Sequence, residues 1–135
     1  MKNVILLIAL CLIGLKASSQ IYKYRCYKDK WIDYNAADDK QMKWQEVNIL
    51  VVFNLDKLKI RIFAQSEKNL DIIKAYQPFV NSNGDKQTNF ECVDESGVKC
   101  TGNLITYETT RDDYHIATIA LNYADGCFLY RLKDI

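Results

Sequence analysis

The feature that most constrains the fold is a pair of alternating apolar runs between residues 47 and 64. Every second residue is apolar over residues 47–55, and the same alternation returns over residues 58–64. Successive side chains of a β-strand point to opposite faces, so each run predicts a strand with one buried face. Only Asp56-Lys57 separates the runs. The pattern therefore predicts a β-hairpin.

The short break also predicts how the two strands of this hairpin face each other. Phe53 would lie opposite Ile60, and Val51 opposite Ile62, on the buried side. The dipeptide of the loop is not the Asn-Gly pair that two-residue turns favour. A longer loop that begins at Asn54 is therefore the alternative.

The rest of the chain continues the strand pattern at short spacing. Apolar runs predict further strands over residues 21–27, 70–76, 88–94, 98–107, 112–123 and 127–133. The segment 35–45 breaks the pattern and is typical of either one short helix or a polar loop. Seven or eight short strands with at most one short helix predict an all-β fold, a small antiparallel barrel or sandwich.

The N-terminus has the three parts of a secretory signal peptide. A lysine precedes an apolar run over residues 4–15, and small residues follow up to Ser19. The run is shorter than the about 20 apolar residues that span a bilayer, so we expect cleavage after Ser19 and no stable membrane insertion. Residues 1–19 would be removed. Residues 20–135 would form a single antiparallel β domain that is exported to the periplasm or the extracellular space.

The charge of the chain argues against a nucleic-acid partner. There are 18 basic and 17 acidic residues, and they include no basic run. A near-neutral chain without such a run lacks the electrostatic footprint of proteins that bind nucleic acid.

Four cysteines follow the signal peptide, and in an exported domain they predict two disulfides. The strands over residues 88–94 and 98–107 would form a hairpin that places Cys92 opposite Cys100 if its loop is Glu95-Ser96-Gly97. A two-residue loop would shift the register by one residue and separate the two cysteines.

A Cys92–Cys100 bridge leaves Cys26 to pair with Cys127. This second bridge would tie the first strand to the last, as expected if the sheet closes on itself. A metal site is not predicted, because no cysteine pair has the short spacing of a zinc site and His115 is the sole histidine. No other cofactor is predicted either.

Two stretches, together with the export signal, resemble small secreted proteins of unknown function from Bacteroidota. These are residues 52–57, Val-Phe-Asn-Leu-Asp-Lys, and residues 92–100, Cys-Val-Asp-Glu-Ser-Gly-Val-Lys-Cys. The resemblance covers most of the chain after the signal peptide. It implies an exported, mainly antiparallel domain, and it carries over no function and no catalytic residue.

No pattern in the chain predicts a catalytic site. His115 lies on an alternating apolar run and is interpreted as a histidine of the core or its rim. Asp112 and Asp113 are adjacent, so on a strand they would point to opposite faces and could not act as a pair in glycoside hydrolysis. In the turn-rich segment 81–85 the glycine is the fourth residue and not the sixth, which argues against a calcium loop.

Aromatic residues crowd the N-terminal third of the chain. Tyrosine and tryptophan are favoured where a partner or a sugar ring is bound, although they also pack at sheet edges. The candidate binding residues are Tyr22, Tyr24, Tyr27, Trp31, Tyr34 and Trp44. The sequence thus predicts a non-catalytic binding module whose partner is a protein surface, a glycan surface or a small apolar ligand. A secreted hydrolase using scattered carboxylates and a structural envelope component are the alternatives.

Overall fold

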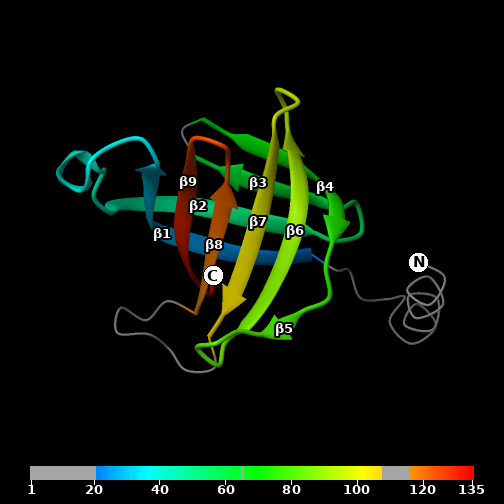
Figure 1. Cartoon of the computed structure of the whole chain (residues 1–135). Helices are drawn as coiled ribbons and strands as arrows, with labels where there is room; N and C mark the ends of the chain where they lie inside the picture. Colours follow the sequence, from blue (N-terminus) through cyan, green and yellow to red (C-terminus); the bar gives the residue numbers. More distant parts are fainter. Residues whose placement is uncertain (1–20, 65, 108–115) are drawn as a thin grey trace, which may run out of the picture.

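The computed structural model describes residues 21–64, 66–107 and 116–135. These ranges contain nine strands and one short 3-10 helix (Figure 1). In chain order the elements are β1 (Ile21–Asp33), η1 (Asp38–Lys40), β2 (Gln45–Asn54), β3 (Lys59–Phe63), β4 (Lys68–Ala75), β5 (Phe79–Val80), β6 (Lys86–Asp94), β7 (Lys99–Thr106), β8 (Ala117–Asn122) and β9 (Gly126–Lys133). Within the same ranges, no helix has the length and apolar character needed to cross a membrane.

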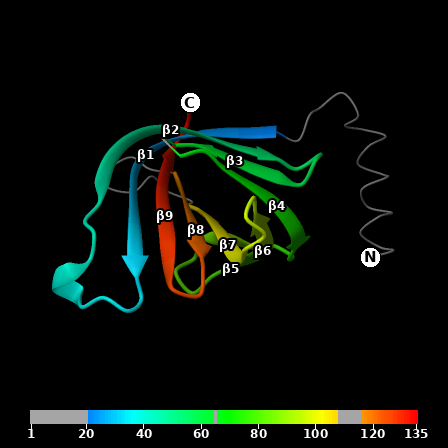
Figure 2. The same cartoon turned by 90° about the horizontal axis from the view of Figure 1, so that it is seen from above.

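Eight of the strands close into an antiparallel barrel. They pair in the order β4-β3-β2-β1-β9-β8-β7-β6, and a pairing between β4 and β6 closes the ring. The short β5 pairs with the first residues of β6, beyond the end of β4. Figure 1 and Figure 2 show the strands arranged around one interior. The predicted all-β class is confirmed, and of the two predicted architectures the chain adopts the barrel.

The predicted register of the central hairpin is confirmed. The β2–β3 pair places Val51 opposite Ile62 and Phe53 opposite Ile60, and all four side chains are buried. The side-chain oxygen of Asn54 accepts a hydrogen bond of 3.1 Å from the backbone of the third residue after it, which holds the turn. Local alternation and a short polar break were sufficient to fix this register.

The register predicted from the three-residue loop is also confirmed. The β6–β7 pair places Cys92 directly opposite Cys100. Gly97 has a φ of 81°, the left-handed conformation that glycine adopts without steric cost. The side chain of Asp94 accepts two hydrogen bonds of 2.9 Å from backbone N–H groups of the loop. These contacts exclude the two-residue alternative.

All four cysteines of the barrel are free thiols in this structure, so neither predicted disulfide is present. The Cys26–Cys127 prediction is wrong in its geometry. Cys26 lies opposite Leu132, and Cys127 lies opposite Ile32, so the two cysteines are separated by about 16 Å of strand. A disulfide needs Cα atoms within about 7 Å of each other. The first strand does pair with the last, but the two thiols lie at different heights along the pair.

β1 is longer than the sequence pattern predicted. It runs on to Asp33, with a register shift between Cys26 and Lys28 in its pairing with both neighbours. An extra residue in one strand interrupts the two-residue alternation. The pattern over residues 31–34 is therefore compatible with either a continuation or a return of the first strand, and the structure shows the continuation. The segment 35–45 is largely loop, with η1 as its only helical turn.

The hydrophobic core fills the inside of the barrel. Its buried members are Cys26, Ile49, Val51, Phe53, Ile60, Ile62, Leu70, Ile72, Phe90, Cys92, Cys100, Ala117, Ile119, Leu121, Tyr130 and Leu132. They come from every strand of the ring. Phe90 packs over Gly102 on the next strand, so closely that a Cβ atom there would lie 2.0 Å from its ring. The core therefore uses a glycine to seat an aromatic ring.

Candidate functional site

A cavity of about 360 Å³ opens at one end of the barrel. This is the end at which β1 and β6 begin and β2, β4 and β7 finish. Its lining residues are Tyr22, Tyr24, Phe53, Leu55, Ile72, Ala75, Pro78, Lys86, Thr88, Phe90, Leu104 and Thr106. Because strands from both sides of the barrel contribute, ring closure creates the pocket.

Aromatic rings form the part of the pocket that meets the core. Phe53 and Phe90 are both 4% exposed, and their ring centroids lie 6.4 Å apart in an edge-to-face arrangement. The ring of Tyr24 lies edge-on to Phe53 at 6.0 Å. Edge-to-face pairs of this kind contribute more stabilisation than the burial of their surface alone would give. The inner wall is therefore apolar and held in one arrangement.

Side chains without aromatic rings line part of the outer pocket. Thr88 and Leu104 face each other across the β6–β7 pair, and Lys86 and Thr106 face each other one step nearer the rim. Ala75 lies at the end of β4, the other neighbour of β6, where it is opposite Phe90. Apart from Phe90, none of these positions carries an aromatic ring that could fill the opening.

The other end of the barrel is filled with aromatic side chains. The rings of Trp31 and Phe128 lie 4.5 Å apart, and Tyr123 contacts Phe128 edge-on at 6.1 Å. The Nζ atom of Lys68 lies 4.1 Å from the centre of the Phe128 ring. Within the described residues, the cavity opens at one end of the barrel and aromatic side chains pack the other end.

Few polar groups line the pocket. Lys86 is exposed at the rim, and the hydroxyl of Thr106 donates a hydrogen bond of 3.5 Å to the Lys86 carbonyl. Burial raises the pKa of the Tyr24 phenol above 10.0. Hydroxyls without a neighbouring base are not nucleophiles at neutral pH. The described residues of this lining can hold a molecule and offer it a polar rim.

The six aromatic residues predicted to bind a partner do not form one surface. Tyr22 and Tyr24 line the pocket, whereas Trp31 packs inside the filled end. Tyr34 is exposed in the β1–β2 connection, where its hydroxyl donates a hydrogen bond of 3.4 Å to Asn122. The six residues are spread along the whole length of β1 and over the β1–β2 connection, so crowding in the sequence does not bring them together.

The remaining two aromatic candidates lie beside cations. Arg131 and Lys30 both lie over the ring of Trp44, with the Arg131 Cζ atom at 4.1 Å and the Lys30 Nζ atom at 4.9 Å from its centre. The Nζ atom of Lys133 lies 4.2 Å from the centre of the Tyr27 ring. These contacts are on the β1–β9 pair and are separate from the pocket.

The chemistry-bearing residues singled out in the sequence give no second site. His115, Asp112 and Asp113 lie outside the described residues. Among the residues that are described, no group of three histidine, cysteine or acidic side chains is arranged to hold a metal ion. The turn 81–85 is held by its own contacts, since the Asn81 side chain accepts hydrogen bonds of 2.9 and 3.1 Å from the loop backbone.

Sequence reasoning missed most of the pocket. Ile72, Phe90 and Leu104 read as ordinary apolar members of alternating strands, and nothing local separates them from core residues. They share a place in the fold, because β4, β6 and β7 bring their inward-facing side chains together around the cavity. That shared place can be recognised only once the order of strands around the barrel is known.

The buried thiols have strongly perturbed acidities. Burial raises the pKa of the Cys26 thiol from 9.0 to about 12. A hydrogen bond from Cys92 lowers the pKa of the Cys100 thiol from 9.0 to about 7, and the same interaction raises the pKa of Cys92. Burial also raises the pKa of Tyr130 above 10.0.

The raised pKa of the Cys26 thiol predicts a loss of stability at alkaline pH. The unfolded Cys26 thiol loses its proton near pH 9, while the folded one keeps it to about pH 12, so unfolding is favoured as the pH rises between these values. The contribution of Cys26 to this loss is roughly 2 to 4 kcal/mol. Chemical denaturation of the reduced protein at pH 8 to 11 is the measurement. Cys26→Ser should give a shallower decline, and identical slopes would contradict the assignment.

Comparison of the chain with protein-family models, with curated proteins and with solved structures found no match. The function has to be inferred from the geometry of the barrel itself.

Proposed function

We propose that this protein is a non-catalytic binding module that holds a small apolar ligand in the open end of its barrel. The observation that carries the proposal is the cavity of about 360 Å³ with its wall of apolar and aromatic side chains. Small-molecule sites are typically concave, about 300 to 1,000 Å³ in volume and mainly apolar. An eight-stranded barrel is also about the size that holds one small ligand.

The walls and the rim favour different parts of such a ligand. Phe53, Phe90 and Ile72 would contact an apolar body, because burying apolar surface releases about 25 cal/mol for each Å² removed from water. Lys86 and the threonine hydroxyls at the rim would contact a polar end group. The proposed ligand is therefore a small, mostly apolar molecule that keeps its polar end toward solvent.

Fluorescence titration tests this function. The probe is N-phenyl-1-naphthylamine, whose emission rises when it leaves water for an apolar site. We expect saturable binding of one probe molecule per barrel and its displacement by a medium-chain fatty alcohol. A signal that rises without saturating, or that no apolar competitor reduces, would contradict the proposal.

We also propose that the protein is exported, with cleavage after Ser19. The support is the pattern of residues 1–19 and the presence of four cysteines in a small domain. Mass spectrometry of the protein recovered outside the cytoplasm should give a chain that begins at Gln20. A chain that still carries Met1 would contradict export by this route.

In an oxidising compartment we expect Cys92 and Cys100 to form the disulfide that the hairpin register allows. Directly opposite residues of an antiparallel pair have Cα atoms about 4.5 to 5.5 Å apart, within the range of disulfides. Oxidation with oxidised glutathione should stabilise the barrel by about 2 to 3 kcal/mol, since the closed loop is short. Thermal melts before and after oxidation measure the gain. A bridge from either cysteine to Cys26 in the peptide map would overturn the pairing.

A further inference from the structure

The outer face of the β1–β9 pair carries a double row of cations. Arg25 lies opposite Lys133, and Lys28 lies opposite Arg131. Lys30 follows on β1, two residues beyond Lys28. The residues between them on the ladder, Cys26 and Leu132, are buried in the core, so these five side chains face outward. We call them the basic ladder.

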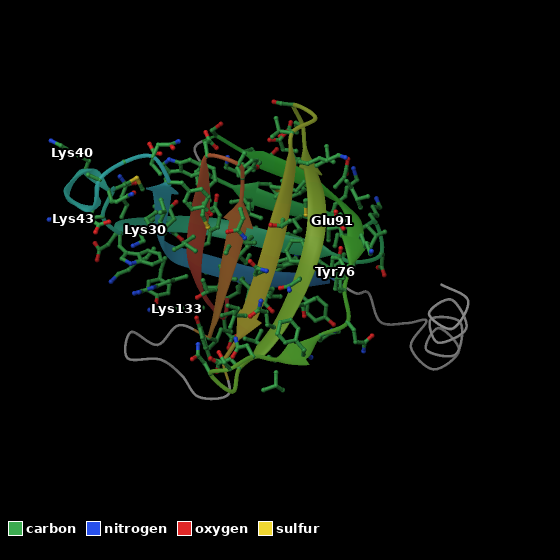
Figure 3. The ribbon with its side chains drawn as sticks, in the orientation of Figure 1. Lys30, Lys40, Lys43, Tyr76, Glu91 and Lys133 are labelled. Carbon is green, nitrogen blue, oxygen red and sulfur yellow. The ribbon has the colours of Figure 1, made fainter. Side chains whose placement is uncertain are left out.

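Aromatic rings hold several of these cations in place. Lys30 and Arg131 lie over Trp44, and Lys133 lies over Tyr27, at the distances given above. Contacts between a cation and an aromatic face are worth about 0.5 to 1 kcal/mol at exposed sites. Figure 3 shows Lys30 and Lys133 on the same side of the molecule as Lys40 and Lys43 of the β1–β2 connection.

The fold gathers positive charges on one face, although the chain as a whole is nearly neutral. The whole chain has 18 basic and 17 acidic residues, yet the basic ladder meets one acidic neighbour in its register, Glu46 opposite Lys28. Two ion pairs lie elsewhere on the barrel, between Lys59 and Asp71 and between Arg61 and Glu67. Within the described part of the chain, neither Lys28 nor Lys30 nor Lys133 makes an ion pair.

We propose that the basic ladder binds an acidic polysaccharide. Residues on the same face of a strand recur about every 7 Å, and paired strands lie about 5 Å apart, so the five cations form a narrow track of positive charge that follows β1 through its register shift. Such a track is complementary to an extended chain that carries carboxylate or sulfate groups at regular intervals. This site is independent of the pocket, because none of its residues lines the cavity.

Two other polyanions fit this surface less well. Nucleic acids in single-stranded form are held by bases that stack on open aromatic faces, whereas Trp44 and Tyr27 have cations over their rings. A membrane surface favours protruding apolar side chains beside the charges. Ile73, Phe79 and Val80, three large exposed apolar residues, lie on β4 and β5 and not on the basic ladder, and Ile135 follows Lys133 by two residues.

Heparin, a sulfated polysaccharide, is the probe for the test. We expect the protein to bind heparin at low ionic strength and to dissociate as salt is added, because salt screens exposed charges. The triple variant Lys28→Gln, Lys30→Gln and Lys133→Gln should bind heparin at least about tenfold more weakly. These side chains face outward, so its thermal melt should stay close to that of the parent.

The matched control removes the same charge from other faces of the barrel, with Lys57→Gln, Lys74→Gln and Lys99→Gln, and it should retain heparin binding. Equal losses in the two triple variants would overturn the proposal, as would the absence of heparin binding in the parent. Single-stranded DNA and vesicles rich in phosphatidylserine are titrated in parallel. If either binds as tightly as heparin and depends on the same three lysines, the assignment to a polysaccharide is wrong.

Discussion

Replacing Gly126 by alanine is expected to lower the free energy of unfolding by about 3 kcal/mol, one of the largest effects of adding a single methyl group to this barrel. A Cβ atom at this position would lie 2.2 Å from the Trp31 ring and 2.4 Å from the carbonyl oxygen of Ile32. Gly126 starts β9 directly opposite Asp33 at the end of β1. The backbone cannot move away there without separating β9 from β1.

Urea denaturation of the Gly126→Ala variant measures this effect, and Ala124→Ser in the exposed turn beside it is the control with little expected change. A double-mutant cycle with Trp31→Leu separates the two clashes. Removing the indole ring should recover only part of the lost stability, because the Ile32 carbonyl remains. A Gly126→Ala variant as stable as the parent would show that β1 and β9 do not approach as closely as described.

Filling the pocket from within should abolish ligand binding while the barrel stays folded. Leu104 points into the cavity from β7 and is only partly buried, so Leu104→Trp adds its ring mainly to open space. We expect the N-phenyl-1-naphthylamine signal to fall by more than about tenfold, because the larger side chain occupies the volume that the probe needs. The melting temperature should change little.

The matched control for pocket filling is Val52→Trp. Val52 lies on β2 between the buried Val51 and Phe53, so its side chain points away from the interior. This variant adds the same aromatic group to the outer surface and should leave probe binding unchanged. If Leu104→Trp still binds the probe as the parent does, the probe sits somewhere other than the cavity.

Local patterns in the sequence were sufficient for the two hairpins. The pairs Phe53–Ile60 and Cys92–Cys100 follow from alternation on either side of a short loop, and each is reproduced residue for residue. Hairpin register depends only on loop length and side-chain period, both of which are written in a continuous stretch of chain.

Features that depend on ring closure could not be obtained in this way. The β1–β9 pairing was anticipated, but its register was not, and Cys26 and Cys127 therefore lie at different heights. The register shift between Cys26 and Lys28 has no local sequence mark. The basic ladder could not be predicted from the sequence either, because its members come from opposite ends of the chain and meet only through the β1–β9 pairing.

The pocket itself depends on which strand ends are brought together. Tyr22 and Tyr24 were singled out for their residue type, and they line the cavity only because β1 begins at its open end. Trp31, chosen on the same grounds, lies at the filled end because it is near the other terminus of the same strand. Residue type identified candidate binders, and strand direction decided which of them reach the cavity.

Methyl-resolved NMR of the protein titrated with N-phenyl-1-naphthylamine is the most direct test of binding inside the barrel. The methyl groups of Ile72 and Leu104 line the cavity, whereas Ile49 is buried in the core outside it and Ile73 is exposed on β4. We predict saturable shifts at Ile72 and Leu104, with Ile49 and Ile73 unchanged. Shifts at Ile73 without shifts at Ile72 and Leu104 would place the ligand on the outer surface and contradict the proposed function.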